Sequence, residues 1–359
     1  MQHKYTLERK MLMKNVLMIG SDIEVKGGIS SVEKILLDSD TLNKEVNLLF
    51  LATHAEYPKL IKYLHCVLAV IKYIWILAVK KNDVVYAHMS YGSGFYRKSV
   101  FALIGVMFKK SIIFHAHGST FEEFYAGSSK IARKYISFVL NKSDKVIVLS
   151  KKWEKFYGAF VQKDKLVVVY NSTDVPFMNM YNSSNMDIVF LGRLGERKGV
   201  YDILDIIPDI TRKHKQVRFI LAGDGDISKV KEIIKAKNLE NVELPGWIGS
   251  AQKDTVLKNA GIYILPSYRE GFPLSVLEAM AYGVPVITTN IGGISEKINS
   301  GEDAILIKPG DKNALKENIL KLLEDENYRI RLSKNGYDKV SRMHNNDRFI
   351  KEISGILNS

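Results

Sequence analysis

The stretch YILPSYREGFPLSVLEAMAYGVPVITT (263–289) gives the clearest indication of how this chain folds. Residues 263–267 are typical of a short buried strand. Gly271 and Pro273 then break the chain, so we expect a helix to begin near Ser275. That helix would start at the carboxyl end of the strand, where its free backbone N–H groups and the positive end of its dipole suit a phosphate group.

Two glutamates, Glu270 and Glu278, flank this turn eight positions apart. Glu270 on the loop could accept hydrogen bonds from a ligand over the helix start, and Glu278, about one helical turn in, could reach a second set of hydroxyls. A hexose and a ribose flanking a diphosphate would satisfy both carboxylates. The alternative is that both are ordinary exposed glutamates, as most glutamates are.

A second stretch, MDIVFLGRLGERKGVYDIL (186–204), predicts an apolar strand, a basic turn and a helix. Arg193 and Lys198 lie on that turn, and such turns line the ligand edge of a parallel α/β sheet. Arginine holds phosphate oxygens in a fork and lysine approaches as a point charge, so the pair suits a diphosphate. We expect Arg197 to be solvated.

An ordered set of motifs makes the C-terminal half similar to a known family. The motifs are VVYNSTD (168–174), GRLGERKG (192–199), LAGDGD (221–226), PGWIG (245–249), PSYREGFPLSVLEAMAYGVPVITTNIGG (266–293) and IKPGD (307–311). They resemble family 4 of the retaining, nucleotide-sugar-dependent glycosyltransferases (glycosyl transferases group 1), which includes bacterial capsule and exopolysaccharide enzymes. The resemblance implies an α/β protein of the GT-B fold, with two Rossmann-like domains facing each other across a cleft.

The resemblance also implies roles for single residues. Arg193 and Lys198 match residues that hold the donor diphosphate, Glu270 matches the contact to the transferred sugar, and Glu278 matches the contact to the ribose. Further donor contacts are implied for Gly271, Phe272, Pro273, Leu274, Ser275, Trp247 and Ile248. Since the two cations and the helix start would meet the leaving-group charge, we expect no metal or other cofactor. Glu270 is assigned to donor positioning, and nucleophilic attack is its less favoured role.

The length and strand pattern predict two α/β domains. A chain of 359 residues exceeds one ordinary core, and apolar strands alternate with helical stretches. These strands are expected at 16–20, 84–88, 111–117 and 146–150. We expect an acceptor-side domain over residues 1–175, joined by a C-terminal helix at about 345–359, and a nucleotide-sugar-binding domain over 186–340. The Asn- and Ser-rich segment 171–187 reads as the linker.

Cysteine content and the start of the chain bear on location. Cys66 is the only cysteine, which excludes an internal disulfide and gives no support for an oxidising destination. The first residues lack the apolar core and cleavage site of a secretory signal, so we expect a cytoplasmic protein. Residues 1–13 are expected to be a ragged extension, or to reflect an upstream start before Met11 or Met13.

The net charge of +13 is concentrated in the N-terminal half. Residues 1–180 hold 26 Lys and Arg against 15 Asp and Glu. Between Tyr57 and Lys110, Asp83 alone opposes nine basic residues: Lys59, Lys62, Lys72, Lys80, Lys81, Arg97, Lys98, Lys109 and Lys110. This distribution predicts an anionic partner.

An anionic membrane fits that partner better than nucleic acid does, because the basic residues interleave with the apolar runs 63–79 and 100–108 instead of with a nucleic-acid motif. Lys72 interrupts the first run, which is short for a membrane span. Its large residues Leu64, Leu68, Ile71, Trp75 and Leu77 predict a helix that is part core and part interfacial anchor. The alternative is a buried helix with a fringe of solvated lysines.

A pair of adjacent glycines follows the first predicted strand of the N-terminal half. Gly27 and Gly28 precede a predicted helix and would let backbone approach a ligand closely. They do not form a Gly-x-Gly-x-x-Gly fingerprint, which argues against a dehydrogenase. The resemblance implies that this loop faces the donor diphosphate from across the cleft, while a plain turn is the alternative.

Three histidines end predicted strands. His88, His115 and His117 would lie at the ligand edge of a parallel sheet. We prefer His117 as the catalytic residue, because family members place a histidine at this His-Gly step, beside the transferred sugar and the acceptor. His115 is expected to lie in the core. Zinc is disfavoured, since no cysteine lies near and no carboxylate completes an evident ligand set.

These observations predict a retaining, metal-independent hexosyltransferase that moves a sugar from a nucleoside diphosphate sugar to a saccharide acceptor. Basic charge beside apolar helices favours a polyprenyl-linked acceptor at the inner face of a bacterial membrane, hence surface polysaccharide synthesis, with the enzyme peripheral on that membrane. A soluble acceptor is the alternative. The rival functions are a GT-B nucleotide-sugar hydrolase or epimerase and a non-catalytic sugar-nucleotide-binding subunit of a polysaccharide assembly complex.

Overall fold

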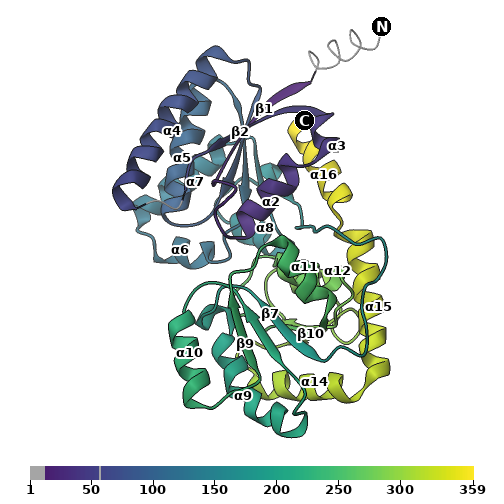
Figure 1. Cartoon of the computed structure of the whole chain (residues 1–359). Coiled ribbons are helices and arrows are strands. Elements are labelled where there is room, and N and C mark those ends of the chain that lie inside the picture. The colour runs from purple at the N-terminus through teal and green to yellow at the C-terminus, as the bar shows by residue number, and fades with distance from the viewer. Residues whose placement is uncertain (1–12, 56–57) are drawn as a thin grey trace. The chain divides into compact units, whose positions relative to one another are not determined.

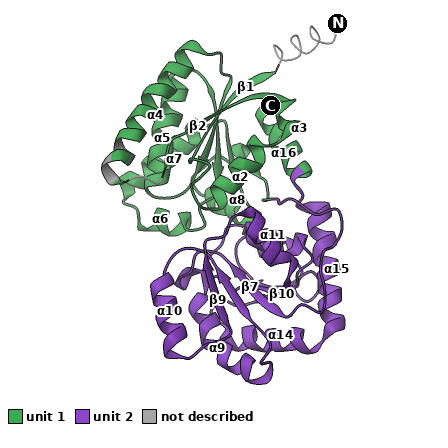
Figure 2. Ribbon diagram, in the orientation of Figure 1, with its two compact units in different colours: residues 1–171, 347–359 green, residues 172–346 purple. Residues whose placement is uncertain are grey.

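The computed structural model describes residues 13–55 and 58–359 and divides the chain into two compact units (Figure 1, Figure 2). Unit 1 comprises the described residues up to Asn171 together with Asp347–Ser359, and unit 2 comprises Ser172–Asn346. The ragged extension that we expected at the N-terminus falls on residues 1–12 and so lies outside the described residues.

Unit 1 contains a six-stranded sheet in the order β2-β1-β3-β4-β5-β6, and all neighbouring strands in it are parallel. Every residue of β3 is buried. Because helices cover both faces of a parallel sheet, such strands read as apolar runs and not as alternating patterns. The strands are β1 (Lys14–Gly20), β2 (Val46–Ala52), β3 (Val84–Met89), β4 (Ser111–Ala116), β5 (Lys145–Val148) and β6 (Leu166–Val168).

The helices of unit 1 connect these strands. They are α2 (Gly28–Leu37), α3 (Asp40–Asn43), α4 (Lys59–Val79), α5 (Ser93–Met107), α6 (Phe121–Gly127), α7 (Lys130–Lys142), α8 (Lys151–Tyr157), the 3-10 helix η1 (Lys163–Lys165) and α16 (Asn346–Asn358). Within the described part of the chain, no helix combines the length and the apolarity needed to cross a membrane, and this includes the 21-residue α4.

The last helix, α16, completes the core of unit 1. Phe349, Ile350, Ile353 and Leu357 lie on one face of this amphipathic helix and are each at most 3% exposed. The ring of Phe349 lies 6.4 Å from that of His115 in β4, centroid to centroid. The end of the chain therefore packs with the sheet formed by the first half of the sequence.

Unit 2 contains the second six-stranded sheet, in the order β12-β11-β10-β7-β8-β9, and it too is parallel throughout. The strands are β7 (Asp187–Leu191), β8 (Phe219–Ala222), β9 (Val242–Gly246), β10 (Ala260–Leu265), β11 (Val286–Thr289) and β12 (Ile305–Ile307). The predicted α/β class with two Rossmann-like sheets is thus confirmed.

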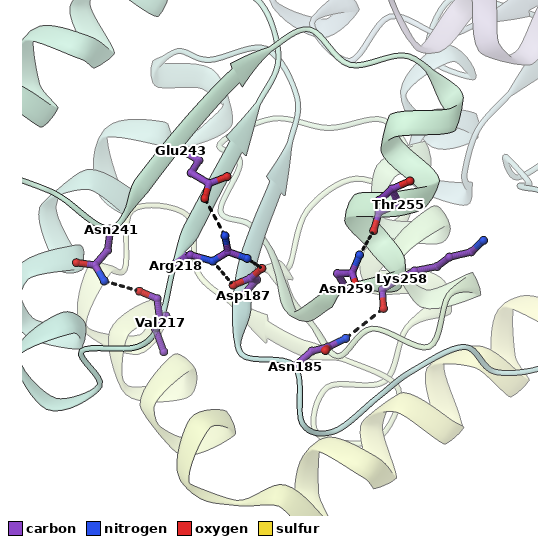
Figure 3. Close-up of polar contacts among 9 residues, drawn as sticks. All are labelled: Asn185, Asp187, Val217, Arg218, Asn241, Glu243, Thr255, Lys258 and Asn259. Carbon is purple, nitrogen blue, oxygen red and sulfur yellow. Dashed lines mark hydrogen bonds and ion pairs between the residues drawn. The ribbon is translucent and has the colours of Figure 1, made fainter.

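Polar contacts fasten the amino ends of three of these strands (Figure 3). Arg218, directly before β8, donates to Asp187 at the start of β7 (2.5 Å) and to Glu243 in β9 (2.9 Å). Asn241 donates to the carbonyl of Val217 at 2.9 Å. Because the Arg218 side chain is 53% exposed, these pairs add little stability. The opposite, carboxyl edge carries the predicted donor residues.

Two helices of unit 2 begin within one residue of the predicted positions. α9 begins at Val200, and α12 begins at Leu274, one residue before the expected start. The helices of unit 2 are the 3-10 helix η2 (Glu196–Lys198), α9 (Val200–Lys213), α10 (Ile227–Ala236), α11 (Ser250–Lys258), α12 (Leu274–Ala281), α13 (Ile294–Lys297), α14 (Lys312–Glu324) and α15 (Glu326–Met343).

Unit 1 buries two opposite charges that the sequence analysis had not singled out as a pair. Glu33 is 0% exposed and accepts from the Ser21 N–H at 3.1 Å, while Lys98 is 3% exposed and donates to the Gly20 carbonyl at 2.7 Å and to the Thr53 hydroxyl. Burial raises the pKa of Glu33 to about 7 and lowers the pKa of Lys98 to about 7, and the attraction between the two charges opposes each shift. The pair anchors the end of β1 to α2 and α5.

Replacing Lys98 with methionine should therefore destabilise unit 1. Breaking a buried charge pair typically costs about 3–5 kcal/mol, because the remaining charge is left uncompensated. The double variant Lys98→Met/Glu33→Gln should recover part of this loss. Urea unfolding, monitored through hydrogen exchange at β1 and β3, measures the stability of the single and of the double variant. Lys34→Met, on the exposed face of α2, is the control and should change stability by less than about 0.5 kcal/mol. A double variant less stable than Lys98→Met would contradict the pairing.

Candidate active site

Two turns that are far apart in sequence meet at the carboxyl edge of the unit 2 sheet. β7 and β10 are neighbours, so the turn after β7 lies beside the loop after β10. The Tyr268 N–H donates to the Arg197 carbonyl at 2.8 Å, which joins the two segments. This contact brings the side chains of Lys198 and Glu270 together.

Lys198 and Glu270 form a buried ion pair. The Lys198 Nζ lies 2.6 Å from Glu270 Oε1, and the two side chains are 14% and 7% exposed. The alternative that Glu270 is an exposed loop charge is therefore wrong: a carboxylate this deeply buried is stable only beside a cation. An ammonium group has three N–H donors, so Lys198 can donate to a second anion while it holds Glu270.

Arg197 also contacts this loop. Its guanidinium donates to the Arg269 carbonyl at 3.1 Å and lies 4.0 Å from Glu270 Oε1. The expectation that Arg197 is solvated holds only in part, because its side chain is 39% exposed. Gly199 ends this turn with a φ of 73°, and a β-carbon there would collide with the Pro266 carbonyl. Only glycine permits this approach of the two segments.

Glu278 lies in the second turn of α12 and has a partner of its own. Its Oε1 accepts from Lys253 of α11 at 2.6 Å, and the two side chains are 18% and 29% exposed. Glu278 is thus partly buried and not an ordinary solvated helix glutamate. No sequence pattern points to Lys253, which lies 25 positions away on another helix.

The start of α12 directly follows the Glu270 loop. Pro273 occupies the N-cap position and no side chain caps the first turn. Phe272 is 3% exposed, and its ring lies 5.1 Å from that of His344. Gly271 is also buried, whereas Leu274 and Ser275 are half-buried. The buried residues hold the loop in one conformation. The first backbone N–H groups of α12 come directly after them in the chain.

The segment that follows β11 also contacts the Glu270 loop. The Gly293 N–H, after β11, donates to the Gly271 carbonyl at 2.7 Å. A β-carbon at Gly292 would collide with the carbonyls of Glu270 and Gly271. The contact between these two loops therefore depends on glycine at position 292, a role that sequence reasoning had not assigned.

The other predicted donor residues of unit 2 are more exposed. Arg193 is 67% exposed, and its guanidinium lies 3.8 Å from Asp224. Asp224 and Asp226 have the Asp-x-Asp spacing of a metal motif, so the interpretation of the sequence as having no such motif was wrong. Asp226 accepts from the Tyr201 hydroxyl at 2.9 Å. Trp247 follows β9 and is 45% exposed, while Ile248 is half-buried.

The predicted residues of unit 1 lie at the carboxyl edge of its own sheet. Gly27 is the N-cap of α2 with a φ of 149°, and Gly28 is the first residue of that helix. Both are exposed, and no side chain caps the helix. His117 directly follows β4 and is half-buried.

The three histidines that end strands form one cluster in unit 1. His115 is fully buried, as expected, and His88 is only 2% exposed. His88 Nδ1 lies 3.0 Å from His117 Nε2, and the Tyr86 hydroxyl lies 2.6 Å from His115 Nδ1. Burial lowers the pKa of each ring, that of His117 to about 3, so all three are neutral imidazoles at pH 7.

Comparison with known proteins identifies the domain that carries the ion pair. Residues 179–339 match the family described as Glycosyl transferases group 1. This region is a glycosyl transferases group 1 domain. The transferase domain thus includes Arg193, Lys198, Glu270, Glu278, Trp247 and Ile248, together with the start of α12. The resemblance read from the sequence motifs is confirmed at the level of this family.

Relatives of the chain carry the names of glycosyltransferases. An uncharacterized glycosyltransferase of Methanocaldococcus jannaschii is 28% identical over 260 residues, which cover 71% of this chain and 69% of the relative. The 2-deoxystreptamine N-acetyl-D-glucosaminyltransferase of Niallia circulans is 33% identical over 161 residues, 44% and 41% of the two chains. The capsular polysaccharide biosynthesis glycosyltransferase CapM of Staphylococcus aureus is 26% identical over 238 residues, 65% and 60% of the two chains. Glycosyltransferase activity is therefore supported.

Solved structures share the fold over nearly the whole chain. Sucrose-phosphate synthase from Thermosynechococcus elongatus superposes with a TM-score of 0.76 and 19% identity, covering 96% of this chain and 98% of the other. HepE of Anabaena, solved in complex with UDP and glucose, superposes with a TM-score of 0.75 and 19% identity. The match covers 97% of this chain and 100% of HepE. These similarities confirm the GT-B fold class.

Adding one methyl group at Gly292 should impair the transferase domain. Gly292→Ala would push the Glu270 loop away from its place, and a misplacement of about 1 Å can cost roughly 100-fold in rate. Sugar transfer measured at saturating donor should fall accordingly. Gly355→Ala in α16 is the matched control, since a β-carbon there meets no atom within 4 Å, and should leave the rate unchanged. Equal rates for both variants would show that the loop does not rely on this contact.

Proposed function

We propose that the protein is a retaining glycosyltransferase that takes a sugar from a nucleoside diphosphate sugar bound in unit 2. The observation that carries this proposal is the buried Lys198–Glu270 pair at 2.6 Å beside the uncapped start of α12. A cation, a carboxylate and a helix N-terminus at one sheet edge offer partners for a diphosphate and for sugar hydroxyls. HepE, which shares the fold, was solved with UDP and glucose.

The proposed chemistry depends on charge at the leaving diphosphate. Lys198, Arg193 and the N–H groups that begin α12 stabilise the negative charge that grows as the sugar departs, with no metal ion in this role. Glu270 positions the sugar through its hydroxyls, and Lys198 fixes the carboxylate for that task. The leaving phosphate oxygen accepts the proton of the acceptor on the same face, so no enzyme nucleophile is required. Glu278, held by Lys253, receives the ribose.

The acceptor we propose is a lipid-linked saccharide, presented at an anionic membrane. Helix α4 lies along the outside of unit 1 beside α5 (Figure 1). One face contacts the core through Ala69, Tyr73, Ile76 and Leu77, each at most 5% exposed. The opposite face exposes eight large apolar side chains by 40–64%: Ile61, Leu64, Val67, Leu68, Ile71, Ile74, Trp75 and Val79. The alternative of an ordinary buried helix is therefore wrong for this face.

Charge near that apolar face suits an anionic lipid surface. Lys72, Lys80 and Lys81 are exposed on α4 or directly after it. Exposed apolar side chains in such number typically mark an interaction site, and flanking lysines typically select anionic lipid. One sequence expectation needs correction: Lys98 is buried and adds nothing to the surface charge. Leu77 belongs to the core face of the helix. The side chains of Lys59 and Lys62 lie outside the described part of the chain.

Donor consumption with and without membrane extract separates the proposed function from its rivals. A transferase consumes the nucleoside diphosphate sugar efficiently only when acceptor is present, and the product retains the anomeric configuration of the donor. A hydrolase or epimerase consumes donor without extract. A non-catalytic subunit binds donor, which raises its thermal stability, but does not turn it over. Inversion of the anomeric configuration would overturn the retaining assignment.

Removing either cation should slow transfer more than it weakens nucleotide binding. Charge on the diphosphate grows toward the transition state, so Lys198→Ala and Arg193→Ala should each lower kcat by about 10²–10³-fold. Because Lys198→Ala also strands a buried carboxylate, the double variant Lys198→Ala/Glu270→Gln should be made alongside it. Arg212→Ala, an exposed arginine on α9, is the control. Near wild-type kcat at saturating donor in both single variants would refute the diphosphate assignment.

The two glutamates should separate by the part of the donor that they contact. Glu278→Ala should weaken binding of a plain nucleoside diphosphate and of the whole donor alike, because both contain the ribose. Glu270→Ala should spare the plain nucleotide and impair sugar transfer. Calorimetric titration with nucleoside diphosphate and with nucleoside diphosphate sugar measures the difference. An equal loss of nucleotide affinity in both variants would contradict this division of roles.

Membrane binding should be reversible and depend on salt. Each lysine near an anionic surface contributes about 1 kcal/mol, so changing Lys72, Lys80 and Lys81 to glutamine should weaken vesicle binding roughly 100-fold. Vesicle co-sedimentation should rise with anionic lipid content and fall in high salt. The control variant changes Lys34, Lys44 and Lys142, which are exposed on other parts of unit 1. Absence of vesicle binding at every salt concentration would favour a soluble acceptor.

A further inference from the structure

The histidine cluster of unit 1 has a geometry that packing alone does not explain. The ring centroids of His88, His115 and His117 lie 4.1 to 5.3 Å from one another. One ring nitrogen of each residue lies within 4.8 Å of one from each of the others. His88 and His115 are paired in register on the neighbouring strands β3 and β4, and His117 follows β4 directly. Three potential ligand atoms therefore converge on one point at the carboxyl edge of the sheet.

Two of these rings carry buried nitrogens that have no partner. His88 Nε2 and His115 Nε2 are both inaccessible and make no hydrogen bond. Buried polar atoms are nearly always paired, so each exception calls for an explanation. His88 Nδ1 is paired with His117 Nε2 at 3.0 Å, and His115 Nδ1 with the Tyr86 hydroxyl, so Nε2 is the nitrogen that each of His88 and His115 has left for a ligand.

Tyr86 fixes the orientation of one ring. Its hydroxyl lies 2.6 Å from His115 Nδ1, on the side of the ring opposite the unpaired Nε2. Histidines that bind metals almost always hold their second nitrogen in such a hydrogen bond, which sets the tautomer and aims the lone pair. Tyr86 is itself fully buried in β3. The pair therefore has the form of a metal ligand with its supporting partner.

We propose that His88, His115 and His117 bind one divalent transition-metal ion of the zinc class. Three neutral imidazoles form a known protein ligand set for zinc, with the fourth position left to water or to an oxygen of a bound molecule. The sequence argument against zinc asked for a cysteine or a carboxylate, and a set of three histidines requires neither. His117 is half-buried and gives the ion a route from solvent.

Two charged residues near the histidines, Lys98 and Glu33, affect a bound cation in opposite ways. Lys98 is close enough to lower the pKa of His88, so a cation there repels the metal. Glu33, buried beside Lys98, supplies an opposite charge in the same region. The pair as a whole is neutral in formal charge and leaves the site open to a dication.

This proposal does not depend on the proposed sugar transfer. The Lys198–Glu270 pair lies in unit 2, and the histidines lie in unit 1. An ion held by His117 would engage a nitrogen that the predicted acceptor-side role also needs. Metal binding itself, and not activity, is therefore the appropriate readout.

The test measures binding of Zn²⁺ and Co²⁺ to the full chain without an affinity tag. We expect one ion per chain by equilibrium dialysis, and visible absorption bands of four-coordinate Co²⁺ on titration. His117→Ala, at a half-buried position, should abolish the bands. His214→Ala in unit 2 should leave them unchanged. A wild-type chain that binds no ion, or binds it as tightly as His117→Ala does, would overturn the proposal.

A second pair of variants distinguishes a specific zinc site from nonspecific metal binding. Tyr86→Phe removes only the hydroxyl beside His115 and should weaken Zn²⁺ binding about 10- to 100-fold. Tyr73→Phe is a matched control: Tyr73 is equally buried in unit 1, but its hydroxyl donates to the Phe101 carbonyl at 2.9 Å. Circular dichroism establishes that both variants fold. Equal Zn²⁺ affinity of the two variants would overturn the proposed site.

Discussion

Parallel strands constrain both units of this protein. Each strand can be followed by a parallel neighbour only after a crossover, so the turn that leaves each strand lies at the carboxyl edge of its sheet. In unit 2 this rule places the turn after β7 beside the loop after β10, because the two strands are neighbours although 68 residues separate Leu191 from Ala260 in the chain. In unit 1 the same rule places Gly27 and the three histidines at one edge. The chemistry of each unit is therefore a consequence of its topology.

Buried charge is the second organising feature. Lys198 with Glu270 in unit 2 and Lys98 with Glu33 in unit 1 each place opposite charges where water is largely excluded. Such pairs add little net stability. In unit 2 the direct contact at 2.6 Å holds Lys198 and Glu270 each in one position. In unit 2 the result is a carboxylate and an ammonium group that need no rearrangement before they meet a ligand. Preorganisation of this kind is what electrostatic catalysis requires.

The sequence predicted the features that depend on local pattern. Gly271 and Pro273 break the chain before α12, and apolar runs bounded by turns predicted β1, β3, β4 and β5. The motif order led to the glycosyl transferases group 1 domain. Lys198 and Glu270 were singled out separately, each from its own turn. Their direct contact was not predicted, because it depends on which strands are neighbours in the sheet.

Other features depend on side-chain direction, which a sequence pattern does not specify. Lys98 reads as a surface lysine, yet it is buried because Glu33, 65 residues earlier, lies within its electrostatic reach. The apolar run 63–79 did not show which of its large residues face the core, and Leu77 is the one of the five named that does. Lys253 has no sequence relation to Glu278 that a motif could reveal.

The packing of α16 has a consequence for how the protein is made. Its apolar face completes the core of unit 1, yet about 175 residues of unit 2 lie between the two parts of unit 1 in the chain. At roughly 5–20 residues per second, a ribosome needs about 10–35 s to synthesise that insertion. During this time the nascent first unit displays the apolar surface that Phe349 and Ile353 later cover. Unit 2 can therefore finish folding before unit 1 does, although its residues emerge later.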